Sequence, residues 1–398
     1  MFAPEDFAPT PCETAAKRQL PDVQQEDARF MAIALRLAER GLGRVAPNPA
    51  VGCLLVKNGT IIARGWTQPG GRPHAEAVAL AQAGPAARGA TCYVTLEPCA
   101  HHGRTPPCAD ALVAAGIQRV VVAMTDPDPR TAGRGIARLQ EAGLMVTTGV
   151  GEPQAQTINR GFLLRMRERR PFVALKLATS IDGRIAAHTG HAHWITGERA
   201  RAHAHLLRAR HDAILIGGRT QRSDDPLLTC RLPGLEAASP IRIVLTRSPH
   251  LDPDSRLMRT ADNWPVWLLL PEGDTAGLAA PDPEEPSRPG LYALTFQTEE
   301  AEDASGTVSS ILRVLATAGI TRLLVEGGGM VTGLFLRARL FDRLYHFTGN
   351  CLIGADGVAA TASLAVADVA RDAPRLRLLA SRSLEETVLS VYEPVGKD

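Results

Sequence analysis

Three residues that bind zinc well and one carboxylate lie close together in the first third of the chain. His74 and Glu76 are followed, after a stretch typical of a β-strand, by Cys99 and Cys108. An imidazole and two thiolates are ligands that zinc prefers, and three protein ligands leave a fourth position for water. Zinc lowers the pKa of such a water, and Glu76 would carry its proton to a leaving group. The pattern predicts a catalytic zinc site that performs hydrolysis.

The same order of residues is typical of zinc deaminases, in which water replaces an amino group on a nucleobase-like ring. Pro98 before Cys99 belongs to this pattern. Taken singly, each residue would more often be a surface histidine or a buried cysteine, but together they favour the metal site. A purely structural zinc would need a fourth Cys or His, and none is evident at a suitable spacing. His101 and His102 are better interpreted as solvent or substrate contacts than as further ligands.

The spacing of the two cysteines separates this chain from deaminases that edit nucleic acids. Eight residues lie between Cys99 and Cys108, whereas the editing enzymes usually read P-C-x-x-C. The inserted polar and cationic groups suit a small phosphorylated substrate. Asn48, between two prolines, is a further expected substrate contact, although such a residue is more often only a turn former.

Composition indicates a globular protein of two domains without a nucleic-acid partner. The chain has 398 residues, 45% of them hydrophobic, and its 44 Lys and Arg nearly balance its 42 Asp and Glu. Seven scattered cysteines do not resemble a disulfide framework, which fits a cytoplasmic location. No apolar run approaches the ~20 residues of a membrane helix, and the N-terminus has no apolar core of a signal peptide. We therefore expect no membrane partner.

The elements that must position the zinc ligands follow from hydrophobic periodicity. A helix capped by Asp27 should precede a hairpin that turns at Asn58 and Gly59. Helices and strands then alternate, which predicts a three-layer α/β sandwich. The expected elements are a helix at 27–41, strands at 51–57 and 60–66, a helix at 74–83, a strand at 91–96, a helix at 108–115, a strand at 119–124, a helix at 135–142 and a strand at 144–150.

A basic stretch at 165–170, followed by Pro171, marks the expected domain boundary. We expect an N-terminal extension at 1–24, a first domain at 25–168 and a second α/β domain at 169–398. Strands of the second domain are expected at 172–178, 213–217, 241–246, 266–270, 291–294 and 323–325, with helices at 198–210 and 308–318. The turn at 326–329 would let backbone N–H groups approach a pyrophosphate, although glycine runs are often only flexible turns.

Seven segments occur together in one order along the chain: 47–53, 74–76, 95–108, 180–183, 194–196, 224–229 and 326–328. With these segments the chain resembles the RibD family, the bifunctional deaminase–reductases of riboflavin biosynthesis, over almost everything after the extension. The resemblance implies a cytidine-deaminase-like α/β/α domain and a dihydrofolate-reductase-like α/β domain. It also implies a phosphorylated diaminopyrimidine substrate, Zn²⁺ and NADPH as cofactors, and a homo-oligomer.

The resemblance assigns residues of the second domain to two ligands. Those implied to face NADPH are Thr179, Trp194, Thr220, Asp224, Gly328, Gly329, Met330, Val331, Thr332, Gly333 and Leu334, and those implied to face substrate are Ala192, Arg208, Leu228, Arg231 and Glu326. Arg208 and Arg231 suit a phosphate because a guanidinium binds its oxygens bidentately, although a lone arginine would more often form a surface ion pair. Lys176 and Asp224 are expected to manage the proton of the reduction.

One position departs from the family pattern. Ala192 stands where the family usually has a serine that touches substrate, next to His193. Either the missing hydroxyl weakens binding or His193 compensates for it.

Three alternatives remain at this level. One is a deaminase of free nucleotides with an inactive or regulatory second domain, and another is an RNA-editing deaminase. The third is a zinc-stabilised binding module without activity.

Overall fold

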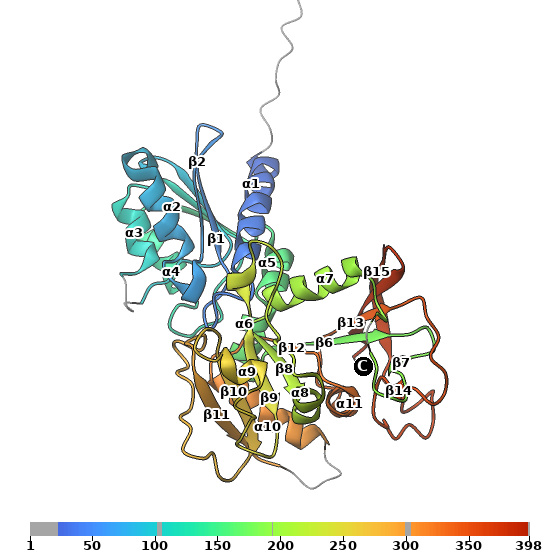
Figure 1. Cartoon of the computed structure of the whole chain (residues 1–398). Coiled ribbons are helices and arrows are strands. Elements are labelled where there is room, and N and C mark those ends of the chain that lie inside the picture. The colour runs from blue at the N-terminus through green and yellow to red at the C-terminus, as the bar shows by residue number, and fades with distance from the viewer. Residues whose placement is uncertain (1–22, 102–105, 193, 299–303, 397–398) are drawn as a thin grey trace, which may run out of the picture.

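The computed structural model describes residues 23–101, 106–192, 194–298 and 304–396, which form two α/β domains (Figure 1). The first domain contains a five-stranded sheet and the second a nine-stranded sheet. Most of the extension expected at 1–24 lies outside the described residues, as do His102 and His193. Within the described part of the chain, no helix has the length and apolarity needed to cross a membrane.

The sheet of the first domain has the order β2-β1-β3-β4-β5. Its strands are β1 (Gly52–Lys57), β2 (Thr60–Trp66), β3 (Thr91–Val94), β4 (Arg119–Val122) and β5 (Met145–Thr148). β1 pairs antiparallel with β2 and β3, whereas β3, β4 and β5 run parallel. Asn58 and Gly59 turn the hairpin with φ of 51° and 72°, which fits the left-handed pair that a two-residue hairpin requires.

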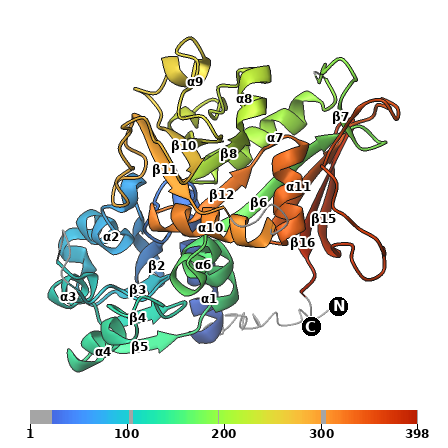
Figure 2. The ribbon, with the colours of Figure 1, turned by 90° about the horizontal axis from the view of Figure 1, so that it is seen from below.

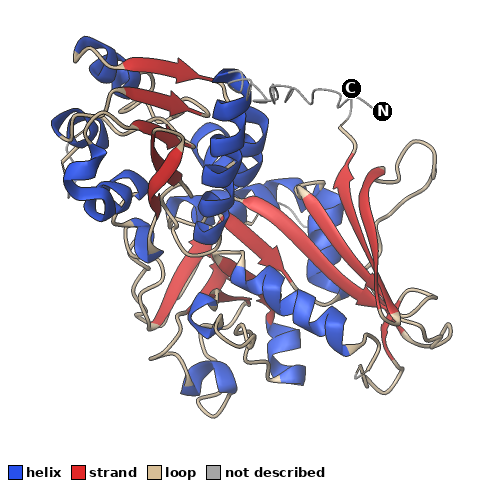
Figure 3. Ribbon diagram, turned by 90° about the horizontal axis from the view of Figure 1, so that it is seen from above, coloured by secondary structure: helices blue, strands red, loops and turns tan. Residues whose placement is uncertain are grey.

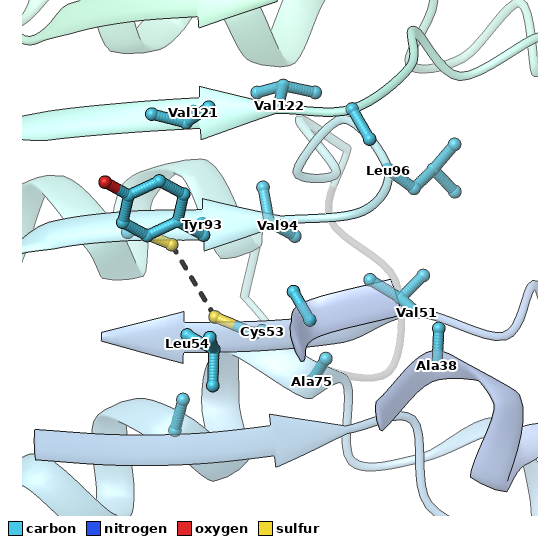
Figure 4. Close-up of a cluster of buried hydrophobic side chains, with 14 of the residues drawn as sticks. Ala38, Val51, Cys53, Leu54, Ala75, Tyr93, Val94, Leu96, Val121 and Val122 are labelled. Carbon is cyan, nitrogen blue, oxygen red and sulfur yellow. Dashed lines mark hydrogen bonds between the residues drawn. The ribbon is translucent and has the colours of Figure 1, made fainter. Parts of the chain in front are cut away.

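Helices cover both faces of this sheet, as the three-layer prediction requires (Figure 3). On one side lie α2 (Ala75–Ala83), α3 (Cys108–Ala114) and α4 (Arg134–Glu141), and on the other lie α1 (Val23–Ala38) and α5 (Glu152–Ile158). The core between them is closely packed, and the thiols of Cys53 and Cys92 lie 3.6 Å apart on neighbouring strands (Figure 4).

The first helix begins at Val23, so the prediction that Asp27 caps it is wrong. Asp27 is 4% exposed and accepts two hydrogen bonds from the Arg119 guanidinium and one from the Tyr93 hydroxyl. Because its carboxylate serves these buried partners, it does not satisfy the N–H groups at the start of a helix.

The second sheet crosses the molecule in the order β11-β10-β9-β8-β12-β6-β13-β16-β15 (Figure 2). β6 to β13 are parallel where they pair within this sheet, and β13, β16 and β15 pair antiparallel at one edge. The strands are β6 (Phe172–Thr179), β8 (Ala213–Gly217), β9 (Ile241–Leu245), β10 (Val266–Pro271), β11 (Leu291–Phe296), β12 (Arg322–Val325), β13 (Arg343–Thr348), β15 (Leu376–Leu384) and β16 (Thr387–Pro394).

Alternate residues of the central strands point into two separate hydrophobic cores. One core is completed by α10 (Ala304–Thr317) and α11 (Gly329–Ala338), and the other by α7 (Glu198–Ala209) and α9 (Arg256–Arg259). α8 (Gly218–Asp224) follows β8, and a small sheet joins β7 (Arg184–Ala186) to β14 (Val358–Ala359). The parallel strands are apolar runs because both of their faces are buried.

The basic stretch at 165–170 includes the end of a helix, α6 (Arg160–Glu168), that packs against the second domain. Arg165 donates to the backbone oxygen of Ala316, and Arg170 makes two hydrogen bonds with Asp342. These contacts hold the segment that joins the two domains against the second domain.

Candidate functional site

The three predicted zinc ligands converge at the ends of two helices. His74 precedes α2, Cys108 is the first residue of α3, and Cys99 lies in the loop after β3. The ligand atoms of the three residues all lie within 4.8 Å of one another, and His74 Nδ1 is 3.7 Å from Cys99 Sγ and 3.4 Å from Cys108 Sγ. One imidazole and two sulfurs at this separation can hold a zinc ion, so the structure brings the three predicted ligands together as a candidate metal site.

The surroundings favour a thiolate at Cys99. The Cys108 side chain, the His74 ring and a hydrogen bond from the Cys108 backbone N–H lower the pKa of Cys99 to about 4. The same interactions, with burial, raise the pKa of Cys108, and the Cys99 sulfur raises the pKa of His74. The three side chains of Cys99, Cys108 and His74 therefore retain a proton. A zinc ion would displace this proton on binding.

Glu76 lies beside the ligands without being one of them. It is in the first turn of α2 and is 4% exposed, and its carboxyl interacts with the Cys108 side chain. Burial raises the pKa of its carboxyl to about 7, although His74 opposes part of this shift. A group that titrates near neutrality can both accept and release a proton, as a general acid–base requires.

Sequence reasoning missed the residue that supports the Cys99 loop. The Glu97 carboxylate is 3% exposed and accepts hydrogen bonds from the backbone N–H groups of Asp126, Gly133, Gly135 and Ile136. It fixes the loop before α4, where Thr131 lies 3.3 Å from His101 Nδ1. The available signal was an acidic residue immediately before Pro98, inside an otherwise apolar run.

Asn48 lies near the segment that leads to His74. A Cβ at Gly71 would come within 2.0 Å of the Asn48 amide nitrogen, so only glycine fits there. Gly71 has a φ of 81°, which also favours glycine. The Asn48 side chain therefore packs against backbone three residues before the first zinc ligand.

In the second domain, three of the predicted polar residues form one partly buried cluster. The Arg208 guanidinium makes two hydrogen bonds of 2.8 and 2.9 Å with the Glu326 carboxylate, and Lys176 Nζ lies 3.7 Å from it. Burial alone would raise the pKa of Glu326, but Arg208 and Lys176 lower it to about 2. The cluster carries an excess of positive charge at the end of β12, beside Arg231.

The glycine turn after β12 leads directly into a helix N-terminus. α11 begins at Gly329, and no side chain caps it. A Cβ at Gly328 would lie 3.1 Å from the Thr220 hydroxyl, which places α8 against the turn. Free N–H groups at a helix N-terminus bind phosphate, so these residues fit NADPH. Met330, 71% exposed, follows the turn, whereas Val331, Thr332 and Gly333 are buried in the helix.

Other predicted residues are not brought into these clusters. Thr179 is buried, with its hydroxyl 2.9 Å from His346 Nε2, and Asp224 is exposed and accepts from the Ser223 hydroxyl. Trp194 is 78% exposed and lies against the Arg201 guanidinium. Among the described residues no hydrogen bond or ion pair joins Asp224 to Lys176.

Two further predicted residues have unusual or open environments. Leu228 is buried with a φ of 59°, a strained conformation for a branched side chain that is often found at functional sites. Ala192 is exposed on the loop before Trp194.

Two family descriptions match the chain, one for each domain. The cytidine and deoxycytidylate deaminase zinc-binding region matches residues 24–124, and the RibD C-terminal domain matches residues 171–390. The second match disfavours a free-nucleotide deaminase with an inactive or regulatory second domain.

Known proteins resemble the chain over nearly its whole length. It is 40% identical to the riboflavin biosynthesis protein RibD of Escherichia coli, with 83% of this chain and 89% of that protein covered. It is 38% identical to RibD of Haemophilus influenzae, with 94% and 99% covered. A solved structure of Acinetobacter baumannii RibD superposes with a TM-score of 0.82 at 34% identity, covering 94% of this chain and all of that one. The candidate zinc site lies in the first of the two matched domains and the glycine turn in the second. The chain belongs to the RibD family of bifunctional deaminase–reductases of riboflavin biosynthesis.

Proposed function

We propose that the first domain deaminates 2,5-diamino-6-ribosylamino-4(3H)-pyrimidinone 5′-phosphate and that the second reduces the ribosyl group of the product. The final product would be 5-amino-6-(5-phospho-D-ribitylamino)uracil. The observation that carries the proposal is the His74, Cys99 and Cys108 cluster with Glu76 beside it, in one chain with a RibD C-terminal domain. A Thermotoga maritima structure with a TM-score of 0.78 and 33% identity is described as the corresponding deaminase and reductase.

In the deaminase domain, each residue has a role that its position supports. Zinc, held by His74, Cys99 and Cys108, supplies an acidified water for attack on the pyrimidine ring. Glu76 accepts a proton from the attacking water and delivers it to the departing amine, so that water and amine exchange as ammonia leaves. Asn48, whose side chain lies against Gly71, is proposed to bind the substrate.

In the reductase domain, NADPH supplies a hydride to the ring-opened imine of the ribosyl group. The turn at Gly328 and Gly329 and the N-terminal half of α11, through Leu334, are proposed to face this cofactor, with Thr220 alongside. Thr179, Trp194 and Asp224 are proposed to complete the cofactor site, and Leu228 and Ala192 to contact substrate.

Arg208, Arg231 and Glu326 are proposed to hold the substrate, and Lys176 and Asp224 to supply the proton. Two features support the placement of phosphate near Arg231. Partial desolvation and the positive charges of Arg208 and Arg256 lower its pKa, and no carboxylate among the described residues forms an ion pair with it.

Three further proposals concern the domain boundaries, the oligomeric state and the location of the protein. We divide the chain into an extension at 1–24, the deaminase domain at 25–168 and the reductase domain at 169–398. We propose a homo-oligomer, because the edge strand β15 exposes Leu378 and Leu379. We propose a cytoplasmic location, since zinc-binding thiolates persist in a reducing compartment.

Mass spectrometry of the product tests the two activities together. Purified protein should convert the amino group of the diaminopyrimidine phosphate to an oxo group without NADPH, and add two hydrogens when NADPH is supplied. Exchange without reduction would contradict the reductase proposal and direct attention to Ala192. No exchange by the zinc-loaded protein would contradict the deaminase proposal.

A further inference from the structure

Asn159 lies between α5 and α6 and makes two hydrogen bonds to a single residue of the deaminase domain. Its side-chain oxygen accepts from the Ala50 N–H at 2.9 Å, and its side-chain nitrogen donates to the Ala50 carbonyl at 3.0 Å. Asn159 is 3% exposed and 109 positions away in sequence. Because one amide satisfies both backbone groups of one residue, it fixes the position and the orientation of that peptide segment.

The segment that Asn159 holds carries Asn48. Ala50 follows Asn48 by two residues, just before β1. On its other side the Thr67 hydroxyl accepts from the Val51 N–H at 3.0 Å and donates to the Pro49 carbonyl at 3.2 Å. The backbone is thus held from two directions, and the Asn48 side chain projects from it onto Gly71.

The other side of Asn159 is fixed to the reductase domain. The next residue, Arg160, forms an ion pair of 2.9 Å with Glu393 on β16. A Cβ at Gly161 would lie 2.3 Å from the Thr321 carbonyl, so α6 and the start of β12 are in close contact. Asn48, Ala50, Asn159 and Thr321 line one narrow cavity between the domains.

We propose that Asn159 is a positioning residue for the deaminase reaction. Its amide clamps Ala50 and so holds Asn48 in the orientation that binds substrate, with the reductase domain as the fixed support. The inference rests on the substrate-binding role of Asn48 in the proposed function, and extends it to a residue that does not touch substrate.

Steady-state kinetics of Asn159→Asp and Asn159→Ala test this role, with ammonia release as the assay. The Asp variant keeps the shape but loses the donor to Ala50, and the Ala variant removes both hydrogen bonds. We expect the deaminase KM to rise about ten-fold while kcat stays within about two-fold. Zinc content and the reductase KM should match those of the wild type. Arg165→Met, which removes a different contact of α6 with the reductase domain, should leave the deaminase KM unchanged.

Asn48→Ala, alone and combined with Asn159→Ala, separates this inference from the function on which it rests. If Asn159 acts through Asn48, the double variant should show little further increase in KM over Asn48→Ala. A raised KM in Asn48→Ala with a wild-type KM in both Asn159 variants would overturn the positioning role alone. A fall in kcat at unchanged KM would also overturn it, because that result indicates only a loss of folded protein. A wild-type KM in Asn48→Ala would overturn the proposed role of Asn48 as well, while ammonia release by the wild type would still establish the deaminase.

Discussion

At the scale of single residues, Glu76 separates metal binding from proton transfer. Glu76→Gln keeps the shape of the side chain but cannot carry a proton. We expect zinc content to be retained and deamination to fall at least about 100-fold, the usual contribution of a general acid–base. Zinc analysis and ammonia release measure the two properties. Reduction of the deaminated substrate provides the control, and full deamination by the variant would remove Glu76 from this role.

Glu97 is a second residue whose role is sharply defined by its contacts. In Glu97→Gln, an amide N–H₂ would face backbone N–H groups that now donate to the carboxylate. Leaving buried donors unpaired should cost about 2–3 kcal/mol of unfolding free energy, measured by urea denaturation. Glu141→Gln, at an exposed helix position, should cost almost nothing. Equal stability of the two variants would contradict the supporting role of Glu97.

His211 should make stability depend on pH. Burial lowers its pKa to about 3. Between pH 6.5 and 3, His211 therefore binds a proton in the unfolded chain but stays neutral in the folded one. Stability from this residue is therefore present above pH 6.5 and is lost as the pH falls, by at most ~1.4 kcal/mol per unit. His211→Asn keeps a donor for the Leu207 carbonyl and does not titrate. Its unfolding free energy should fall less than that of the wild type between pH 7 and 5, and parallel curves would refute the assignment.

Some single residues could be assigned a role from sequence alone, and others could not. His74, Cys99, Cys108 and Glu76 could be predicted because their order along the chain reflects one type of chemistry. The pairing of Arg208 with Glu326 could not be predicted, since 118 positions separate them and each could have formed a surface ion pair with another residue. Asp27 was misinterpreted because a capping residue and a buried acceptor look alike in sequence.

At the scale of elements, the turn before α11 tolerates little added bulk. A Cβ at Gly327 would lie 2.6 Å from Val331 Cβ, so Gly327→Ala must displace the turn. We expect the KM for NADPH to rise about ten-fold with deamination unchanged, because only the phosphate-binding backbone moves. Gly396→Ala, where nothing lies within 4 Å of the added Cβ, is the matched control. An unaltered KM in Gly327→Ala would place the cofactor elsewhere.

Predictability differed between elements for a physical reason. The buried strands β6, β8, β9 and β10 were located within one or two residues because they are continuous apolar runs. β15 and β16 were missed, since the largely exposed residues of β15 and the mostly half-buried residues of β16 give no regular apolar pattern. The helix α6, which links the domains, was predicted only as a solvated helix end and linker. Its arginines bind residues that lie far along the chain, so their role is not visible in the local sequence.

At the scale of the whole molecule, the two activities should be separable by removing the metal. The zinc ligands all belong to the first domain, and the glycine turn and the Glu326 cluster belong to the second. Dialysis against a chelator should abolish ammonia release and leave reduction of the deaminated substrate nearly unchanged. Added zinc should restore the lost activity. Parallel loss of both activities would show that the metal also supports the second domain.

The strand order of the second sheet has a consequence for the order of events during synthesis. β12 lies between β6 and β8, so the middle of this sheet stays open until residues 322–325 have left the ribosome. The first sheet, in contrast, is complete with β5, which ends at Thr148. Domains generally fold as units from the N-terminus. The nascent chain is therefore expected to hold an assembled zinc pocket while its reductase half is still an unfinished polypeptide, and Asn159 gains its rigid support only when β16 has been made.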